Sequence, residues 1–181
     1  MSAVLFQPHS DDCALFSAYN AIRFEAKVIT CFRSVQQDVF GITQDERHAE
    51  DIAAMEALGL AGPEQWYFPD DGNDGDGIHE LRAALSEAVA GCKIVITPAI
   101  EPTANRQHNL VCRLVDEISP STTRIRYLTY SAGAVRSTNG REVAFSPEWV
   151  YRKLAALSCY RSQAKAPSYI HFVDPLIEYV A

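Results

Sequence analysis

Short apolar runs alternate with longer segments of helical period along most of this chain. Five runs are short and rich in β-branched or aromatic residues, as buried strands are: 2–6, 27–32, 65–68, 93–97 and 124–130. Four segments between them repeat their apolar positions every three or four residues, as helices do: 11–25, 44–59, 78–90 and 108–118. This alternation predicts an α/β fold, a mostly parallel sheet covered by helices in three αβα layers.

The helix at 44–59 has the clearest ends. Thr43 is a suitable N-cap, and Glu46 follows it at the spacing of a capping box. Gly59 is suited to end the helix, because glycine readily adopts a left-handed conformation. The sequence therefore predicts where this helix begins and where it stops.

The last part of the chain has a less regular pattern. It predicts a hairpin turning at Asn139–Gly140, a helix at 147–159 opened by Pro147, and a final strand near 169–173. No repeat, linker or low-complexity stretch interrupts the sequence. Residues 1–181 are therefore expected to form a single domain.

Composition excludes several classes of partner. A chain of 181 residues suits one hydrophobic core, and a net charge of -7 without a cluster of Lys and Arg argues against nucleic acid. No run approaches the roughly 18 apolar residues that cross a bilayer, and the first residues lack a signal peptide's basic region, so no membrane partner is expected. Five cysteines without CxxC spacing argue against a disulfide framework and favour a cytoplasmic location.

Two loops that leave the carboxyl ends of predicted strands carry most of the polar chemistry. Residues 7–12 follow the first strand, and residues 98–108 follow the fourth. In open α/β sheets the ligand crevice lies at such ends, where the strand order reverses. If the order reverses between these two strands, the two loops are neighbours.

The first of these loops holds one imidazole and two carboxylates within four residues, His9 to Asp12. Zinc readily binds histidine nitrogen and carboxylate oxygen, and a catalytic zinc keeps one position open for water. In the other interpretation, Ser10 or Asp11 caps the following helix and His9 is a solvated loop residue. The residues of this loop alone favour neither interpretation.

The same residues form the sequence PHSDD, which resembles the PHPDDE signature of the PIG-L/LmbE-like N-acetylglucosaminyl deacetylases. Three later stretches are similar to further motifs of this family, in the family's order. They are Arg47–Glu50 with Leu58–Gly59 (RxxE…LG), Asn105–His108 (HPDH), and Lys153–Leu157 with Ser162–Gln163 (KxxAL…SQ). The resemblance extends from about residue 3 to residue 163, and it implies a Rossmann-like fold and a zinc-dependent hydrolase.

The resemblance also implies roles for individual residues. His9, Asp12 and His108 would bind the metal, Zn²⁺ or another divalent ion, and Asp11 would be the general base that deprotonates its water. The hydroxide would attack the acetamide carbonyl of a small-molecule amino-sugar conjugate and release acetate and a free amine. The implied enzyme is thus an N-deacetylase acting on a linear amide.

Two further residues would belong to the substrate pocket by the same resemblance. Arg47 would stabilise the site or contact the sugar, although an arginine in the first turn of a helix is as often a surface residue. Asp71 would line the pocket mouth from the acidic loop at 70–76, which could equally be a solvated loop.

Three departures from the family pattern affect the chemistry. Cys13 replaces the glutamate after the two aspartates and is expected to be a structural or an exposed thiol rather than a ligand. Asn105 and Gln107 replace the histidine and the aspartate of HPDH. Asn105 can donate a hydrogen bond to a catalytic oxyanion, but it cannot act as a general acid.

This loss leaves two functions open. In the first, the protein is a deacetylase in which Asp11 carries the proton in both directions or another group supplies the acid. In the second, the protein is a catalytically impaired or non-catalytic sugar-binding relative. The short chain also predicts a pocket that is either shallow or completed by a neighbouring subunit, which would make the protein a homo-oligomer.

Overall fold

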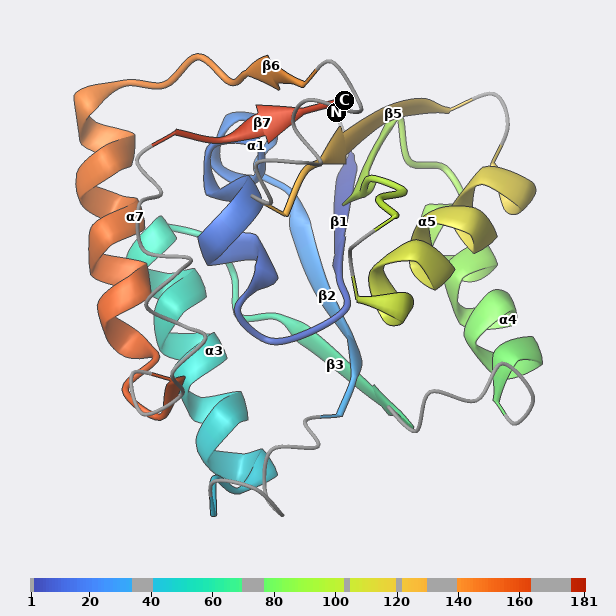
Figure 1. The fold of residues 1–181 in the computed structure, drawn as a ribbon, viewed down its shortest axis with the longest axis horizontal. Coiled ribbons are helices and arrows are strands. Elements are labelled where there is room, and N and C mark those ends of the chain that lie inside the picture. The colour runs from blue at the N-terminus through green and yellow to red at the C-terminus, as the bar shows by residue number, and fades with distance from the viewer. Residues whose placement is uncertain are drawn as a thin grey trace.

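One mostly parallel sheet organises the computed structural model, which describes residues 2–33, 41–69, 77–102, 105–119, 122–129, 140–163 and 177–181. Its strand order is β3-β2-β1-β4-β5-β7-β6 (Figure 1). Five strands run parallel: β1 (Ala3–Gln7), β2 (Lys27–Phe32), β3 (Glu64–Phe68), β4 (Ile94–Pro98) and β5 (Thr123–Tyr127). Two short strands, β6 (Arg141–Glu142) and β7 (Tyr179–Val180), add an antiparallel edge.

Helices cover the two faces of this sheet. Figure 1 shows α4 (Ile78–Val89) and α5 (Arg106–Ile118) on one face, and α1 (Ala18–Phe24), α3 (Gln44–Leu58) and α7 (Pro147–Cys159) on the other. The predicted three-layer α/β fold is therefore confirmed, and the predicted helices and first five strands are present within a few residues of their expected ends. No helix in the described ranges has both the length and the apolar character needed to cross a membrane.

The central strand shows why the sheet is buried on both faces. All five residues of β1 are buried; Val4 and Phe6 belong to the core beneath α4 and α5, whereas Ala3 and Leu5 belong to the core beneath the other helices. Because successive side chains of a strand point to opposite faces, an apolar run without alternation fills two cores at once.

The helix at 44–59 begins and ends as expected. The Thr43 hydroxyl accepts a hydrogen bond from the backbone N–H of Glu46, and Gly59 closes the helix with a φ of 78°. A Cβ at position 59 would meet Arg152 Nη1 at 2.8 Å, so the absent side chain also makes room for that arginine.

The structure departs from the predicted elements at two places, and two further predictions are not tested. The expected helix at 11–25 begins as a π-helical turn, Cys13–Ser17, and becomes α-helical only at Ala18, because Ser17 has a non-helical backbone (φ -146°, ψ 23°). Strand β7 was not predicted, since two residues carry no periodicity. The predicted strand near 169–173 and the turn at Asn139 lie outside the described residues.

A buried ion pair joins α7 to the last strand region. Lys153 Nζ lies 2.7 Å from Glu178 Oε1 and donates a hydrogen bond to the Leu15 carbonyl. Glu178 also accepts the backbone N–H of Tyr19. Burial raises the pKa of Glu178 and lowers that of Lys153, while each partner acts against the other's shift.

We predict that Lys153→Met destabilises the protein by about 3–5 kcal/mol, because it leaves a buried carboxylate without its cation. With the cation gone, the pKa of Glu178 lies further above its unfolded value of 4.5, so the folded state binds the extra proton. Stability of the variant should then be greatest below about pH 4.5 and fall as the pH rises above it. Urea unfolding at several pH values measures both effects.

The matched control is the double variant Lys153→Met/Glu178→Gln, which removes both charges. It should recover a large part of the lost stability and lose the added pH dependence. Equal destabilisation of the single and the double variant would contradict a charge effect.

Candidate metal centre

The strand order reverses between β1 and β4. Strands β2 and β3 lie on one side of β1, and β4 and β5 lie on the other. The turn after β1 and the loop after β4 therefore leave neighbouring strands at the same end of the sheet. This is the adjacency of the two loops that the sequence analysis made conditional on a reversal of strand order.

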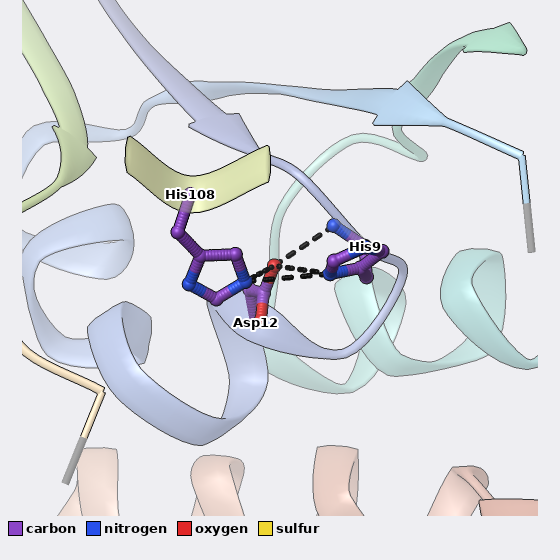
Figure 2. Close-up of side chains that lie close together, drawn as sticks. All are labelled: His9, Asp12 and His108. Atoms are coloured by element: carbon purple, nitrogen blue, oxygen red, sulfur yellow. Dashed lines mark hydrogen bonds and ion pairs between the residues drawn. The ribbon is translucent and has the colours of Figure 1, made fainter. Parts of the chain in front are cut away.

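Three side chains converge at this point. His9 and Asp12 come from the turn after β1, and His108 comes from the first turn of α5 (Figure 2). His108 Nε2 lies 3.3 Å from His9 Nδ1 and 3.2 Å from Asp12 Oδ2, and the third side of the triangle, His9 Nδ1 to Asp12 Oδ2, is 3.6 Å. Residues 99 positions apart in the sequence thus form one compact group.

The size of this triangle fits a divalent ion. Zinc binds histidine nitrogen at about 2.0–2.1 Å, so two ligand atoms of a tetrahedral site lie about 3.3–3.4 Å apart. The three observed separations, 3.2, 3.3 and 3.6 Å, are close to that value. Of two imidazole nitrogens that face each other, at most one can donate a hydrogen bond when neutral, whereas both can bind a cation.

Local hydrogen bonds give the turn its shape. The backbone N–H of His9 donates to Asp12 Oδ2 at 2.8 Å, and the N–H of Asp12 donates to the His9 carbonyl at 3.3 Å. These bonds hold the Asp12 carboxylate beside the two histidine rings. Asp12 stands at the start of the π-helical turn without a side-chain capping bond, so the interpretation of Ser10 or Asp11 as a helix cap is wrong.

The Asp12 carboxylate is buried beside the two histidines. Burial alone would raise its pKa, but charge interaction and hydrogen bonding with His108, and then with His9, hold the pKa well below its usual range. A carboxylate that remains ionised is the form that binds a metal ion.

Asp11 points to a different partner. Its Oδ2 lies 3.5 Å from Nη2 of Arg47. The Arg47 residue is only 2 % exposed, and its Nη1 lies 3.9 Å from Glu50 Oε2. Burial would lower the pKa of Arg47, but Asp11 and the neighbouring carboxylates raise it. The alternative of a surface arginine is therefore wrong, because the guanidinium is buried against the turn that carries His9 and Asp12, here called the metal turn (residues 8–12).

The other residues singled out in the sequence have different environments. Asn105 is exposed and caps α5, its Oδ1 accepting the backbone N–H of Gln107 at 3.1 Å. Cys13 is fully buried in the core, and burial raises the pKa of its thiol well above the usual value, so an exposed thiol is excluded. Asp71 lies outside the described residues, and its role stays a prediction.

A buried polar network beneath the turn escaped the sequence analysis. Its centre is Asp51, whose pKa burial raises to about 7, against the effect of hydrogen bonds from Thr30, Gln7 and Tyr160 and of the Arg47 charge. The available signal was Asp51 itself, an acidic residue four positions after Arg47 on the core face of a helix. Its partners come from distant strands, which the sequence does not bring together.

A cavity of about 550 Å³ lies at the opposite end of the sheet, where β2 begins. Arg23, Lys27, Arg152 and Trp149 are among its lining residues. Each of the three cations already binds a carbonyl or carboxylate of this chain. The concentrated ligand chemistry is thus at the carboxyl ends of the strands, not in this cavity.

No protein-family model and no curated protein matches the chain. Several solved structures share its fold. A triple mutant of Orf2, a deacetylase of the teicoplanin biosynthetic pathway, aligns with a TM-score of 0.76 and 17 % identity over 95 % of this chain and 88 % of its own. The zinc-inhibited form of the same deacetylase aligns with a TM-score of 0.66 and 17 % identity over 90 % of this chain and 85 % of its own.

Two further structures widen the comparison. The N,N'-diacetylchitobiose deacetylase of Pyrococcus horikoshii aligns with a TM-score of 0.67 and 14 % identity over 90 % of this chain and 70 % of its own. GalB, the 4-carboxy-2-hydroxymuconate hydratase of Pseudomonas putida KT2440, aligns with a TM-score of 0.68 and 16 % identity over 96 % and 84 %. At these identities the chain shares the fold of the deacetylases, and that fold also occurs in a hydratase.

We predict that the purified protein binds one divalent ion per chain and that His108→Ala and Asp12→Asn abolish this binding. Removing a hydrogen-bond partner of a ligand costs up to about 100-fold in affinity, so removing a ligand should cost more than that. Zinc titration against a chromophoric chelator measures the affinity. His79→Ala, which removes an exposed histidine of α4, is the control and should bind as the wild type does. Unchanged affinity in the two cluster variants would contradict the site.

Proposed function

We propose that this protein is a metal-dependent hydrolase that removes an N-acyl group, foremost acetyl, from an amino sugar or sugar conjugate. The observation that carries the proposal is the triangle formed by His9, Asp12 and His108 with sides of 3.2–3.6 Å. It lies at the reversal point of a sheet whose fold is that of known deacetylases. The proposal includes membership of the PIG-L/LmbE-like family, which the ordered motifs support.

The three side chains would hold the ion, and zinc is the first choice because two histidines and one carboxylate are a common catalytic zinc set. The teicoplanin deacetylase of the same fold has a zinc-inhibited form, so zinc acts on at least one protein of this fold, there as an inhibitor. An ion held there would supply Lewis-acid catalysis and a water of lowered pKa.

Asp11 is the proposed general base. Its neighbour in sequence, Asp12, belongs to the cluster, and its own carboxylate is fixed by Arg47 at 3.5 Å. This ion pair orients the carboxylate. Asp11 would take the proton of the attacking water and return it to the departing amine. Arg47 is then a positioning residue rather than a sugar ligand.

Asn105 has a limited role in this scheme. Its Oδ1 is used in capping α5, while its amide NH₂ remains a donor of the type that stabilises an oxyanion. It cannot protonate an amine. In this proposal the proton therefore comes from Asp11, which has both halves of the proton transfer.

We predict that Asp11→Asn lowers acetate release from N-acetylglucosamine conjugates by about 10²–10⁴, the usual value of general acid–base catalysis. Acetate release from a panel of such conjugates measures the rate, and zinc titration shows that the metal is retained. Asp45→Asn, an exposed aspartate in the first turn of α3, is the matched control. A metal-loaded protein without turnover on any conjugate would contradict the proposal.

The second candidate, a non-catalytic sugar-binding relative, rests on one observation. The position where the family has its first HPDH histidine holds Asn105, an exposed residue whose carbonyl oxygen is used in a helix cap. A site without a general acid can bind an acylated sugar without cleaving it.

Asn105→His distinguishes these candidates. If the protein is an enzyme short of its acid, the new imidazole should raise acetate release by about 10², the low end of the range for general acid catalysis. Asn105→Ser is the matched control, because serine retains the cap without adding an acid. A gain in the histidine variant alone supports the hydrolase. No gain, together with binding of the conjugate and unchanged zinc affinity of the histidine variant, favours the sugar-binding protein.

Four further expectations remain predictions from the sequence: a single domain, a cytoplasmic location, no nucleic-acid partner, and assembly as a homo-oligomer.

A further inference from the structure

Asp51 is a fully buried carboxylate beneath the metal turn. Four side chains donate hydrogen bonds to it: Gln7, Thr30, Gln65 and Tyr160, at 2.8–3.1 Å. The first three come from the neighbouring strands β1, β2 and β3, and the fourth follows α7. These hydrogen bonds favour the ionised form, since a carboxylate only accepts hydrogen bonds, and they act against burial, which raises the pKa of Asp51 to about 7.

Gln7 connects this carboxylate to the metal turn. Its Nε2 donates to both oxygens of Asp51, at 3.1 and 3.0 Å, and its Oε1 accepts the backbone N–H of Cys13 at 3.0 Å. Gln7 directly precedes the turn and Cys13 directly follows it. The side chain of Gln7 therefore joins the two ends of the segment that carries His9 and Asp12.

The charge of Asp51, together with the Thr30 hydroxyl, which also accepts a hydrogen bond from Nε2 at 2.8 Å, favours one orientation of the Gln7 amide. A carboxylate repels the amide oxygen and attracts the NH₂ group, so Nε2 must point to Asp51 and Oε1 to Cys13. Without that charge the amide could turn over, and its NH₂ would then face the N–H of Cys13. Two donors cannot bond to each other, so the turn would lose this closure.

We propose that Asp51, acting through Gln7, is a positioning residue that holds the turn bearing His9 and Asp12 in the shape that binds the metal. The inference rests on the proposed metal site but adds residues that touch neither metal nor substrate. Thr30, Gln65 and Tyr160 bind the same carboxylate and tie strands and helices together, whereas only Gln7 reaches Cys13. The two effects can therefore be separated by mutation.

The test compares Asp51→Asn and Gln7→Met with the control Tyr160→Phe, which removes one hydrogen bond to Asp51 without touching the turn. Zinc affinity should fall by about 10–100-fold in the first two variants, the usual cost of losing a partner of the ligand shell, and by less than about threefold in the control. The double variant should bind no more weakly than the weaker single variant, because both changes break one link.

Hydrogen exchange of the metal-free protein gives an independent readout. Protection of the Cys13 amide should fall in Asp51→Asn and Gln7→Met and persist in Tyr160→Phe. If Asp51→Asn does not fold, Gln7→Met alone carries the test, since it breaks the same link.

The outcomes separate this inference from the proposed function. Wild-type affinity in both test variants, or an equal loss in Tyr160→Phe, overturns the role of Asp51 while leaving the metal site in place. A wild-type protein that binds no divalent ion overturns the metal site, and this inference with it.

Discussion

The pairing of β1 with β4 is the constraint on which the site depends. Its register joins Ala3 to Ile94 and Leu5 to Ile96, and both strands are held by fully buried side chains. A slip of one residue would move every side chain of β1 to the opposite face, so two cores oppose it. This register places the turn after β1 beside the loop after β4. His9 can meet His108 only because the apolar core fixes the register of β1 against β4.

Buried polar groups then orient the turn after β1, which the apolar core has already positioned. The face beneath α3 and α7 contains the Lys153–Glu178 pair, the Arg47–Asp11 pair and the Asp51 network. Removing such charges from water is costly, and apolar packing alone would stabilise the fold at less expense. These groups all contact the turn or the π-helical segment that follows it. Hydrogen bonds are directional, so they can fix the orientation of a short polar turn that has little apolar surface to pack.

The sequence predicted the features that local patterns encode. Apolar periodicity located the first five strands, and Thr43 and Gly59 marked the ends of α3 correctly. It failed where distant elements decide the outcome. The environment of Arg47 depends on Asp11 and Tyr160, and Asp51 becomes a hub only when three strands are in register. Cys13 could not be placed because a π-helical turn directs it into the core, and no local pattern announces that turn.

Asparagine stands at position 105, where the similar family motif has a histidine, and this difference links the stability of α5 to the chemistry of the site. Asparagine is among the best N-cap residues, whereas histidine is not favoured there. The cap fixes the first turn of α5, and His108 lies in that turn, its own N–H bonded to the Asn105 carbonyl at 3.1 Å. The residue at the position of the family's proton-donating histidine thus holds His108, a member of the candidate metal cluster, in place. The same position cannot serve both purposes equally well, because the cap needs an acceptor and the acid needs a donor of suitable pKa. In this chain the geometry of the cluster is favoured, and the proposed mechanism assigns proton transfer to Asp11.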